Sequence, residues 1–369
     1  MGTDLLFIGA VLFASLFIWN VPKIWCSRIM MLTTALVLLW IAPVSLLTML
    51  LVAALQWLLW HSSNHHFKKL CTVLSICLPI IPLIIYKLEY KADGWLIPLG
   101  LSYYAFRQIH VAFEHYKGTL KNISLEDYFQ YLLFLPVILV GPIHRMPEMQ
   151  RSLRRLKWSP SYFSEGLERI LYGMVKINFF GNFLFSDKLP HYAASVKLPF
   201  LKTYIETIAF TSNAYFQFAG YSDLAIGMAL IWGIRVMENF NYPFLATNMQ
   251  EFWHRWHISL SSWCRDYIFQ PTIAFTRNLW IALIASMLVL ALWHEISLQY
   301  ILWGVVQALL ILSTATVRKN IPAFSRFIND NFFGRWLGRI WVFHAFAFSC
   351  IIIQAQSFNE LGVKLSNLF

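Results

Sequence analysis

The chain has 369 residues, of which 58% are hydrophobic and only 13% are Asp, Glu, Lys or Arg. Soluble globular domains carry roughly a quarter charged residues, so the composition excludes an ordinary soluble enzyme. A mean hydropathy of +0.57 predicts one all-α, polytopic integral membrane domain over residues 1–369. The net charge of +11 is typical of basic cytoplasmic loops that orient a membrane protein, and we expect no nucleic-acid partner.

Apolar segments follow one another along most of the chain. Lipid offers the backbone no hydrogen-bond partners, so a chain crosses the hydrocarbon core of about 30 Å as helices of about 20 residues. The expected segments are Leu5–Trp19, Ile29–Trp40, Pro43–Trp60, Leu70–Tyr86, Leu96–Phe113, Tyr128–Val140, Gly166–Phe185, Thr203–Ala219, Leu224–Ile234, Leu279–Trp293, Ile296–Leu312 and Ile340–Gln354. Several are short, which predicts nine to eleven transmembrane helices. The first segment lacks the charged start and cleavage site of a signal peptide, so we expect it to be retained.

Two basic clusters indicate the orientation of the chain. Five cations lie within residues 145–157, namely Arg145, Arg151, Arg154, Arg155 and Lys157. Such a cluster beside an apolar run predicts a cytoplasmic loop. The second cluster, around Arg318 and Arg335, is cytoplasmic or interfacial by the same argument.

The stretch Asn239–Pro271 is too polar for a simple membrane span. Ionisable groups at membrane depth persist only when they are buried in protein or line a wet cavity, which predicts a re-entrant segment. An amphipathic helix at the membrane interface explains its Arg and Trp residues about as well. His254 and His257 lie three residues apart and would share one face of a helix.

His294 follows the apolar run Leu279–Leu292 directly. An imidazole near the membrane core is costly enough to indicate a function, and a buried neutral histidine can accept and return a proton near neutral pH. A core histidine satisfied by its neighbours is the plain alternative. The chain contains no His-Glu-x-x-His, G-x-S-x-G or P-loop motif, and its five cysteines show no C-x-x-C pairing. We therefore expect no metal.

Four blocks of sequence resemble the membrane-bound O-acyltransferase family. The similarity is to its bacterial branch, which contains the alginate O-acetylation membrane protein and the D-alanyl transfer protein of teichoic acid. The blocks are Ile97–Arg107, the Gly-Pro-Ile-His-Arg sequence Gly141–Arg145, the block Phe216–Gly227 with Asn239–Phe244 and Glu251–Tyr267, and Leu292–His294 with Leu302–Gly304. The resemblance covers roughly residues 96–310.

The resemblance implies helices around a central tunnel, with His294 and His257 as the catalytic histidines. It implies a cytoplasmic acyl thioester as co-substrate, either an acyl carrier protein or acyl-coenzyme A, with no tightly bound cofactor. The acceptor would be a hydroxyl of an extracytoplasmic polysaccharide, and the location the bacterial cytoplasmic membrane. Residues 145–157 would attract an acidic carrier protein or serve topology alone, and an acylation partner would lie on the opposite face. A transporter, a flippase or an idle scaffold are the alternatives.

Glu295 departs from the family pattern, because glycine usually follows the catalytic histidine. Glu295 either orients His294, as the third group of a triad does, or faces water at the end of a helix. Residues Gly220 to Asp223 would shape the tunnel or form a turn that caps a helix.

Overall fold

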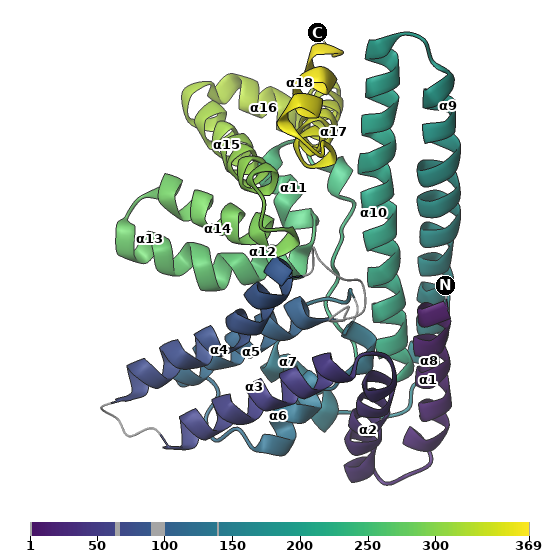
Figure 1. Ribbon diagram of the computed structural model, residues 1–369, viewed down its shortest axis with the longest axis vertical. Coiled ribbons are helices and arrows are strands. Elements are labelled where there is room, and N and C mark those ends of the chain that lie inside the picture. The colour runs from purple at the N-terminus through teal and green to yellow at the C-terminus, as the bar shows by residue number, and fades with distance from the viewer. Residues whose placement is uncertain (1, 63–66, 90–99, 139, 369) are drawn as a thin grey trace. The chain divides into compact units, whose positions relative to one another are not determined.

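The structure of the chain is a computed structural model that describes every residue except 1, 63–66, 90–99, 139 and 369 (Figure 1). All regular elements within the described ranges are helices, and these ranges contain no strand. The expected all-α fold class is confirmed.

The chain forms two compact units. Unit 1 comprises Met1–Tyr172 and Ser222–Met237, and unit 2 comprises Gly173–Tyr221 and Glu238–Phe369. The chain passes between them within the long helices α8 (Pro160–Val175) and α10 (Pro199–Ile231), and again after Met237.

Unit 1 is built around a buried helix. Its elements include α1 (Gly2–Ile18), α2 (Lys23–Ile41), α3 (Pro43–Ser62), α4 (Lys68–Glu89), α5 (Leu101–Lys117), α6 (Leu125–Leu132), the 3₁₀ turn η2 (Leu135–Val137) and α7 (Met146–Arg154). α4 packs on both α3 and α5. Eleven of the twelve residues from Leu101 to Ala112 are buried, which makes α5 the inner helix of this unit.

Unit 2 holds the polar stretch that the sequence marks as unusual. It begins with η3 (Lys176–Lys188), α9 (Leu189–Ser195) and part of α10, and continues with η4 (Pro243–Leu245), α11 (Met249–Arg255), α12 (Ile258–Cys264), η5 (Arg265–Phe269), α13 (Gln270–Thr276), α14 (Leu279–His294), α15 (Leu298–Asn320), α16 (Pro322–Asp330), α17 (Phe332–Gln354) and α18 (Phe358–Ser366). Residues 239–271 therefore form several short elements and not one span, as the sequence predicts.

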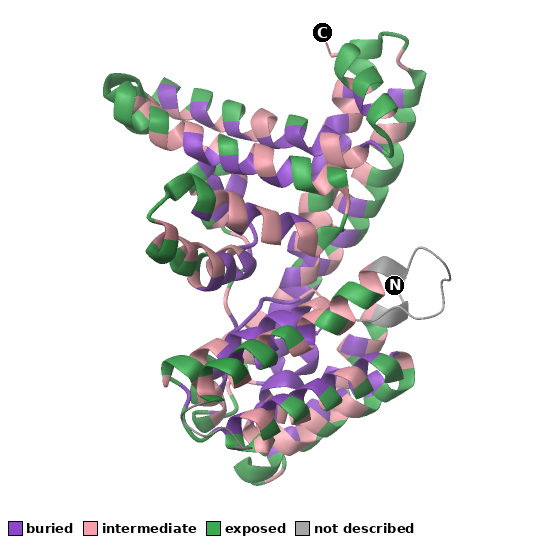
Figure 2. Ribbon diagram, turned by 60° about the vertical axis from the view of Figure 1, so that its left-hand side comes forward, coloured by how far each residue is buried: buried purple, intermediate pink, exposed green. Residues whose placement is uncertain are grey.

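Five helices in the described ranges are long and apolar enough to cross a membrane: Lys23–Ile41, Pro43–His61, Lys68–Lys87, Leu298–Asn320 and Phe332–Gln354. Asp4–Ile18 and Leu279–His294 are shorter apolar helices. Large apolar side chains such as Trp40 and Leu47 are exposed on these elements, and Figure 2 shows exposed residues on the outer faces of the helices and buried ones where helices pack. Such outer faces are expected to contact lipid.

The predicted span Tyr128–Val140 is wrong. α6 ends at Leu132, and the chain continues into a 3₁₀ turn that contains Pro136. The backbone N–H of Leu135 donates to the hydroxyl of Thr34 at 3.0 Å, so a side chain from α2 takes the hydrogen bond that a continuing helix would use. Proline supplies no N–H and disfavours the helical conformation of the residue before it.

The predicted span Thr203–Ala219 and most of Leu224–Ile234 lie in one continuous helix, α10, which ends at Ile231. The intervening residues form neither a turn nor a cap. Asp223 is buried and pairs with Arg169 at 2.7 Å, which satisfies the carboxylate inside the helix. The helix ends only near Gly233, whose φ of +73° is a left-handed conformation that glycine tolerates. Of the predicted span Leu96–Phe113, residues 96–99 lie outside the described residues, and the rest belongs to α5.

Two glycines in unit 1 let α8 and α10 approach closely. A Cβ atom on Gly227 would lie 2.6 Å from the carbonyl oxygen of Gly166, and one on Gly166 would lie 2.8 Å from that of Gly227. Small residues at helix crossings allow such backbone contact in membrane proteins.

We expect Gly227→Val to destabilise the protein, because the new side chain would meet backbone atoms that cannot rotate away. Overpacking of this kind typically costs about 1–3 kcal/mol. Gly9→Val is the matched control, since no atom lies within 4 Å of a Cβ built there. Thermal unfolding of the purified variants in detergent measures the difference, and equal midpoints for the two variants would contradict the close contact.

Candidate functional site

His257 lies at a sharp turn between α11 and α12 and adopts a left-handed backbone conformation, with φ 43° and ψ 53°. Few residues other than glycine adopt this conformation, and it persists where surrounding contacts enforce it. Here the contacts come from Asn239, whose carbonyl oxygen accepts the N–H of Ile258 at 2.9 Å. The N–H of Asn241 likewise donates to the carbonyl of Arg255 at 3.0 Å. Two backbone bonds thus fasten both sides of the turn.

The side chain of Asn239 fixes the protonation of the His257 ring. Its Oδ1 atom receives the hydroxyl of Ser259 at 2.7 Å and the N–H of Ser259 at 3.4 Å, which identifies that atom as the acceptor. The Nδ1 atom of His257 lies 3.2 Å from the same oxygen, so Nδ1 carries the proton and donates. The lone pair of the neutral imidazole then resides on Nε2.

His257 is 2% exposed, and among the described residues its Nε2 has no hydrogen-bond partner. Burial lowers the pKa of the His257 imidazole well below its usual value, so the ring is neutral. The aromatic rings of Phe218 and Trp293 lie 4.5 Å and 5.5 Å from it, measured between centroids. The result is a neutral base with a fixed tautomer in an apolar setting.

His294 is the last residue of α14. Its ring lies 4.3 Å from that of Trp293 and is stacked on Tyr300 with 5.6 Å between centroids. Trp293 therefore contacts both histidine rings, and His294 lies within electrostatic range of His257. The structure brings the two sequence-predicted histidines together within unit 2.

The expectation of a buried imidazole holds for His257 but is wrong for His294, which is exposed. The physical reason is the end of the helix, because α14 stops at His294 and the backbone turns to an extended conformation at Glu295. Glu295 is itself exposed at this helix end. His294 is thus the histidine that a substrate can reach.

His254 and His257 do not share a helix face. α11 ends at Arg255, and the left-handed turn at His257 separates it from α12. Consequently His254 is exposed while His257 is buried. Sequence spacing alone missed this turn, because non-glycine residues rarely adopt such a conformation.

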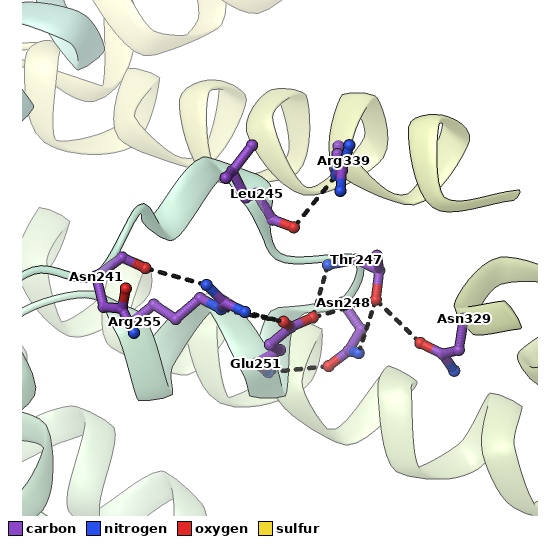
Figure 3. A network of polar contacts seen from close by, with 8 residues as sticks. All are labelled: Asn241, Leu245, Thr247, Asn248, Glu251, Arg255, Asn329 and Arg339. Carbon is purple, nitrogen blue, oxygen red and sulfur yellow. Dashed lines mark hydrogen bonds and ion pairs between the residues drawn. The ribbon is translucent and has the colours of Figure 1, made fainter. Parts of the chain in front are cut away.

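A network of polar contacts supports the segment that leads into the turn (Figure 3). Glu251 accepts the backbone N–H of Thr247 at 2.9 Å and receives two guanidinium bonds from Arg255 at 2.8 and 3.0 Å. Arg255 also donates to the carbonyl of Asn241 at 3.2 Å. The Thr247 hydroxyl donates to Asn329 of α16 at 3.0 Å. One carboxylate therefore connects the residue Thr247 before α11 with Arg255 at the end of that helix.

We expect Glu251→Ala to lower both the melting temperature and the activity, because it removes the shared acceptor and loosens the His257 turn. Glu168→Ala is a suitable control, since Glu168 accepts only an exposed hydrogen bond from Tyr172 among the contacts described. Melting curves and acyl transfer by membranes containing each variant measure the effect. Unchanged activity of Glu251→Ala would contradict a supporting function for the network.

The basic segment 145–157 contains a short helix that sequence analysis did not predict. Arg145 precedes α7, Arg151 and Arg154 lie in its last turn, and Arg155 follows it. Arg151, Arg154 and Arg155 are largely exposed. Cations in the last turn of a helix also interact favourably with its partially negative carbonyl end.

The chain matches the model of the membrane-bound O-acyltransferase family over residues 24–358. Among curated proteins, it is 34% identical to a probable alginate O-acetylase, AlgI, of Pseudomonas aeruginosa over 57% of this chain and 41% of that protein. It is 31% identical to a teichoic acid D-alanyltransferase of Streptococcus thermophilus over 66% of this chain and 63% of that protein. It is 26% identical to a peptidoglycan O-acetyltransferase of Helicobacter pylori over 61% of this chain and 49% of that protein.

The helical architecture and the apolar spans define an integral membrane protein. The chain belongs to the membrane-bound O-acyltransferase family. Its matches span less than half the length of the alginate O-acetylases.

Proposed function

We propose that the protein is an O-acyltransferase of the bacterial cytoplasmic membrane. It moves an acyl group, acetyl or D-alanyl-like, from a cytoplasmic thioester to a hydroxyl of an extracytoplasmic polysaccharide. The observation that carries the proposal is the pair His257 and His294, which contact the same Trp293 ring. The names of the relatives support this class of reaction, since they describe transfer of acetyl or D-alanyl groups to alginate, teichoic acid and peptidoglycan.

His294 acts as the general base in this proposal. Its imidazole accepts the proton of the acceptor hydroxyl while the hydroxyl oxygen attacks the thioester carbonyl. The tetrahedral intermediate then expels the thiolate, which takes the proton back from the imidazolium. The products are an ester and a thiol. Positioned proton transfer of this kind contributes about 10²–10⁴-fold to rate.

His257 acts beside it as a positioning residue. Its Nε2 lone pair can accept a hydrogen bond from a donor in the site, while Asn239 holds the opposite nitrogen. Because the tautomer is set by Asn239, no proton has to move for His257 to accept that bond. The surrounding Phe and Trp rings would exclude water and limit hydrolysis of the thioester.

The thioester donor is either an acyl carrier protein or acyl-coenzyme A, neither of which is a tightly bound cofactor. The exposed arginines at the end of α7 support an acidic partner, because clustered positive charge accelerates association with anions. The positive charge of the same residues would equally serve to orient the protein in the membrane, with this segment on the cytoplasmic side. An extracytoplasmic acylation partner would present the acceptor.

Base-labile ester groups on cell-surface and secreted glycans test the proposed function. Mass spectrometry of glycans from cells that lack the gene, with and without the wild-type gene restored, should show an ester that appears only with the protein. Loss of a glycan from the surface, with its esters unchanged, would instead favour a transporter or flippase. Identical esters and identical glycan amounts in both strains would contradict acyl transfer.

A further inference from the structure

Arg107 is a buried cation in the inner helix of unit 1. It is 1% exposed. Its guanidinium carbon lies 4.7 Å from the centroid of the Tyr131 ring, and the Tyr131 oxygen attracts it electrostatically. Even so, none of its three nitrogens has a hydrogen-bond partner among the residues that the structure describes. A guanidinium offers five N–H donors, and the described residues place no acceptor at hydrogen-bond geometry for any of them, although the Tyr131 oxygen lies nearby.

Other buried polar groups surround this guanidinium. His144 is 3% exposed, and neither of its ring nitrogens has a hydrogen-bond partner within the described ranges. Its ring lies 5.1 Å from that of Tyr131, and it interacts electrostatically with Arg107. The hydroxyl of Tyr104, also near Arg107, is buried and unpaired among the same residues.

Two hydrogen bonds hold His144 and Met146 beside α5 and α6. The Tyr131 hydroxyl donates to the carbonyl oxygen of His144 at 2.7 Å. The backbone N–H of Met146 donates to Nε2 of His110 at 3.1 Å. These bonds tie His144 to α6 and Met146 to α5, one helical turn from Arg107.

The charged residues described near Arg107 do not neutralise its positive charge. Within the described part of the chain, no carboxylate forms an ion pair with it. Arg145 adds positive charge nearby, as its interaction with His144 indicates. Glu114, which interacts electrostatically with His110, is engaged by Lys117 and Thr119. Glu148, which interacts with Tyr131, is exposed. An unpaired buried charge is costly unless an opposite charge is supplied.

We propose that Arg107, His144 and Tyr104 bind the phosphate group of a ligand. Donors that approach from three side chains suit a tetrahedral anion with several free oxygens better than a planar carboxylate. Arginine binds phosphate through two parallel N–H bonds, and the histidine and tyrosine donors can reach its remaining oxygens. The phosphate belongs either to a phospholipid headgroup or to a phosphopantetheine-type thioester carrier. For a thioester carrier the inference rests on the proposed acyl transfer, because the carrier would be its donor; for a lipid headgroup it does not.

Thermal unfolding of the purified full chain in detergent tests the site. Inorganic phosphate, titrated at constant ionic strength against chloride, should raise the melting temperature with saturation, because a ligand that binds only the folded state stabilises it. Arg107→Met should weaken the apparent phosphate affinity at least tenfold. Arg235→Met is the matched control, since Arg235 also lies over a tyrosine ring, 5.1 Å from Tyr162, but is exposed and paired with Glu165.

Two further stability measurements identify the source of the phosphate. Stabilisation by coenzyme A beyond that of inorganic phosphate indicates a pantetheine-type carrier. Stabilisation in nanodiscs of phosphatidylglycerol over phosphatidylcholine, lost in Arg107→Met, indicates a lipid. If Arg107→Met does not fold, Arg107→Lys, which keeps the charge but not the two parallel bonds, should still show the weakened affinity. Absence of any phosphate effect on the wild type, or equal effects on Arg107→Met and Arg235→Met, would overturn the proposal.

Discussion

His294→Ala is expected to reduce the rate of acyl transfer by about 10²-fold or more, because the substitution removes the general base. His294 is exposed at the end of α14, so its truncation opens no cavity in the core. The variant should therefore reach the membrane in normal amounts and keep its melting temperature. Loss of activity without loss of stability distinguishes a chemical function from a structural one.

The rate is measured as labelled acyl groups that appear on glycan over time, at equal amounts of membrane protein. His254→Ala is the matched control, since His254 is an exposed histidine of the same unit to which we assign no function. It should retain the wild-type rate. A His294→Ala variant as active as His254→Ala would show that His294 is not the base.

Asn239→Leu is the second variant for which we expect a large effect, on both stability and activity. The amide oxygen accepts from His257 and Ser259, and Asn239 itself is 0% exposed. Leucine fills similar space but accepts no hydrogen bond, so two buried donors lose their partner. An unsatisfied buried donor typically costs about 1–3 kcal/mol. The His257 ring would also be free to change its tautomer, which should lower the rate of acyl transfer.

Asn239→Asp separates these two effects, because it retains an acceptor oxygen for His257 and Ser259. We expect it to keep more activity than Asn239→Leu. Asn182→Leu is the control for the substitution itself, since Asn182 is exposed and contacts Gln217. Equal activity of Asn239→Leu and wild type, at equal abundance, would show that the tautomer of His257 does not matter for the reaction.

Hydropathy predicted the helical membrane class, because it is a local signal. The motif blocks pointed to His257 and His294, which the structure places against the same Trp293 ring; their catalytic function stays a prediction. The sequence did not predict the exposure of His294, which depends on where α14 ends. The sequence also did not predict that Asn239 would contact His257, although Asn239 lies in a motif block. Its contact with His257 joins residues 18 apart, and only the folded turn brings them together.

The errors in the predicted spans have a similar cause. Gly220 to Asp223 looked like a turn because glycine, serine and aspartate favour turns in isolation. In α10 the ion pair between Asp223 and Arg169 satisfies the carboxylate, and the helix continues. Tyr128–Val140 is apolar enough for a span, but Pro136 and the bond from Leu135 to Thr34 end the helix. Tertiary contacts override local propensity in both places.

The measurement that tests acyl transfer most directly uses membrane vesicles with the cytoplasmic face outward. Vesicles from cells with wild-type protein, His294→Ala, His257→Ala or no protein receive an acyl thioester donor labelled in its acyl group. We predict base-labile label on enclosed glycan with the wild type alone, and labelled donor left intact with both histidine variants. Equal label on glycan in vesicles with and without the protein, or full transfer by His294→Ala, would contradict the proposed function.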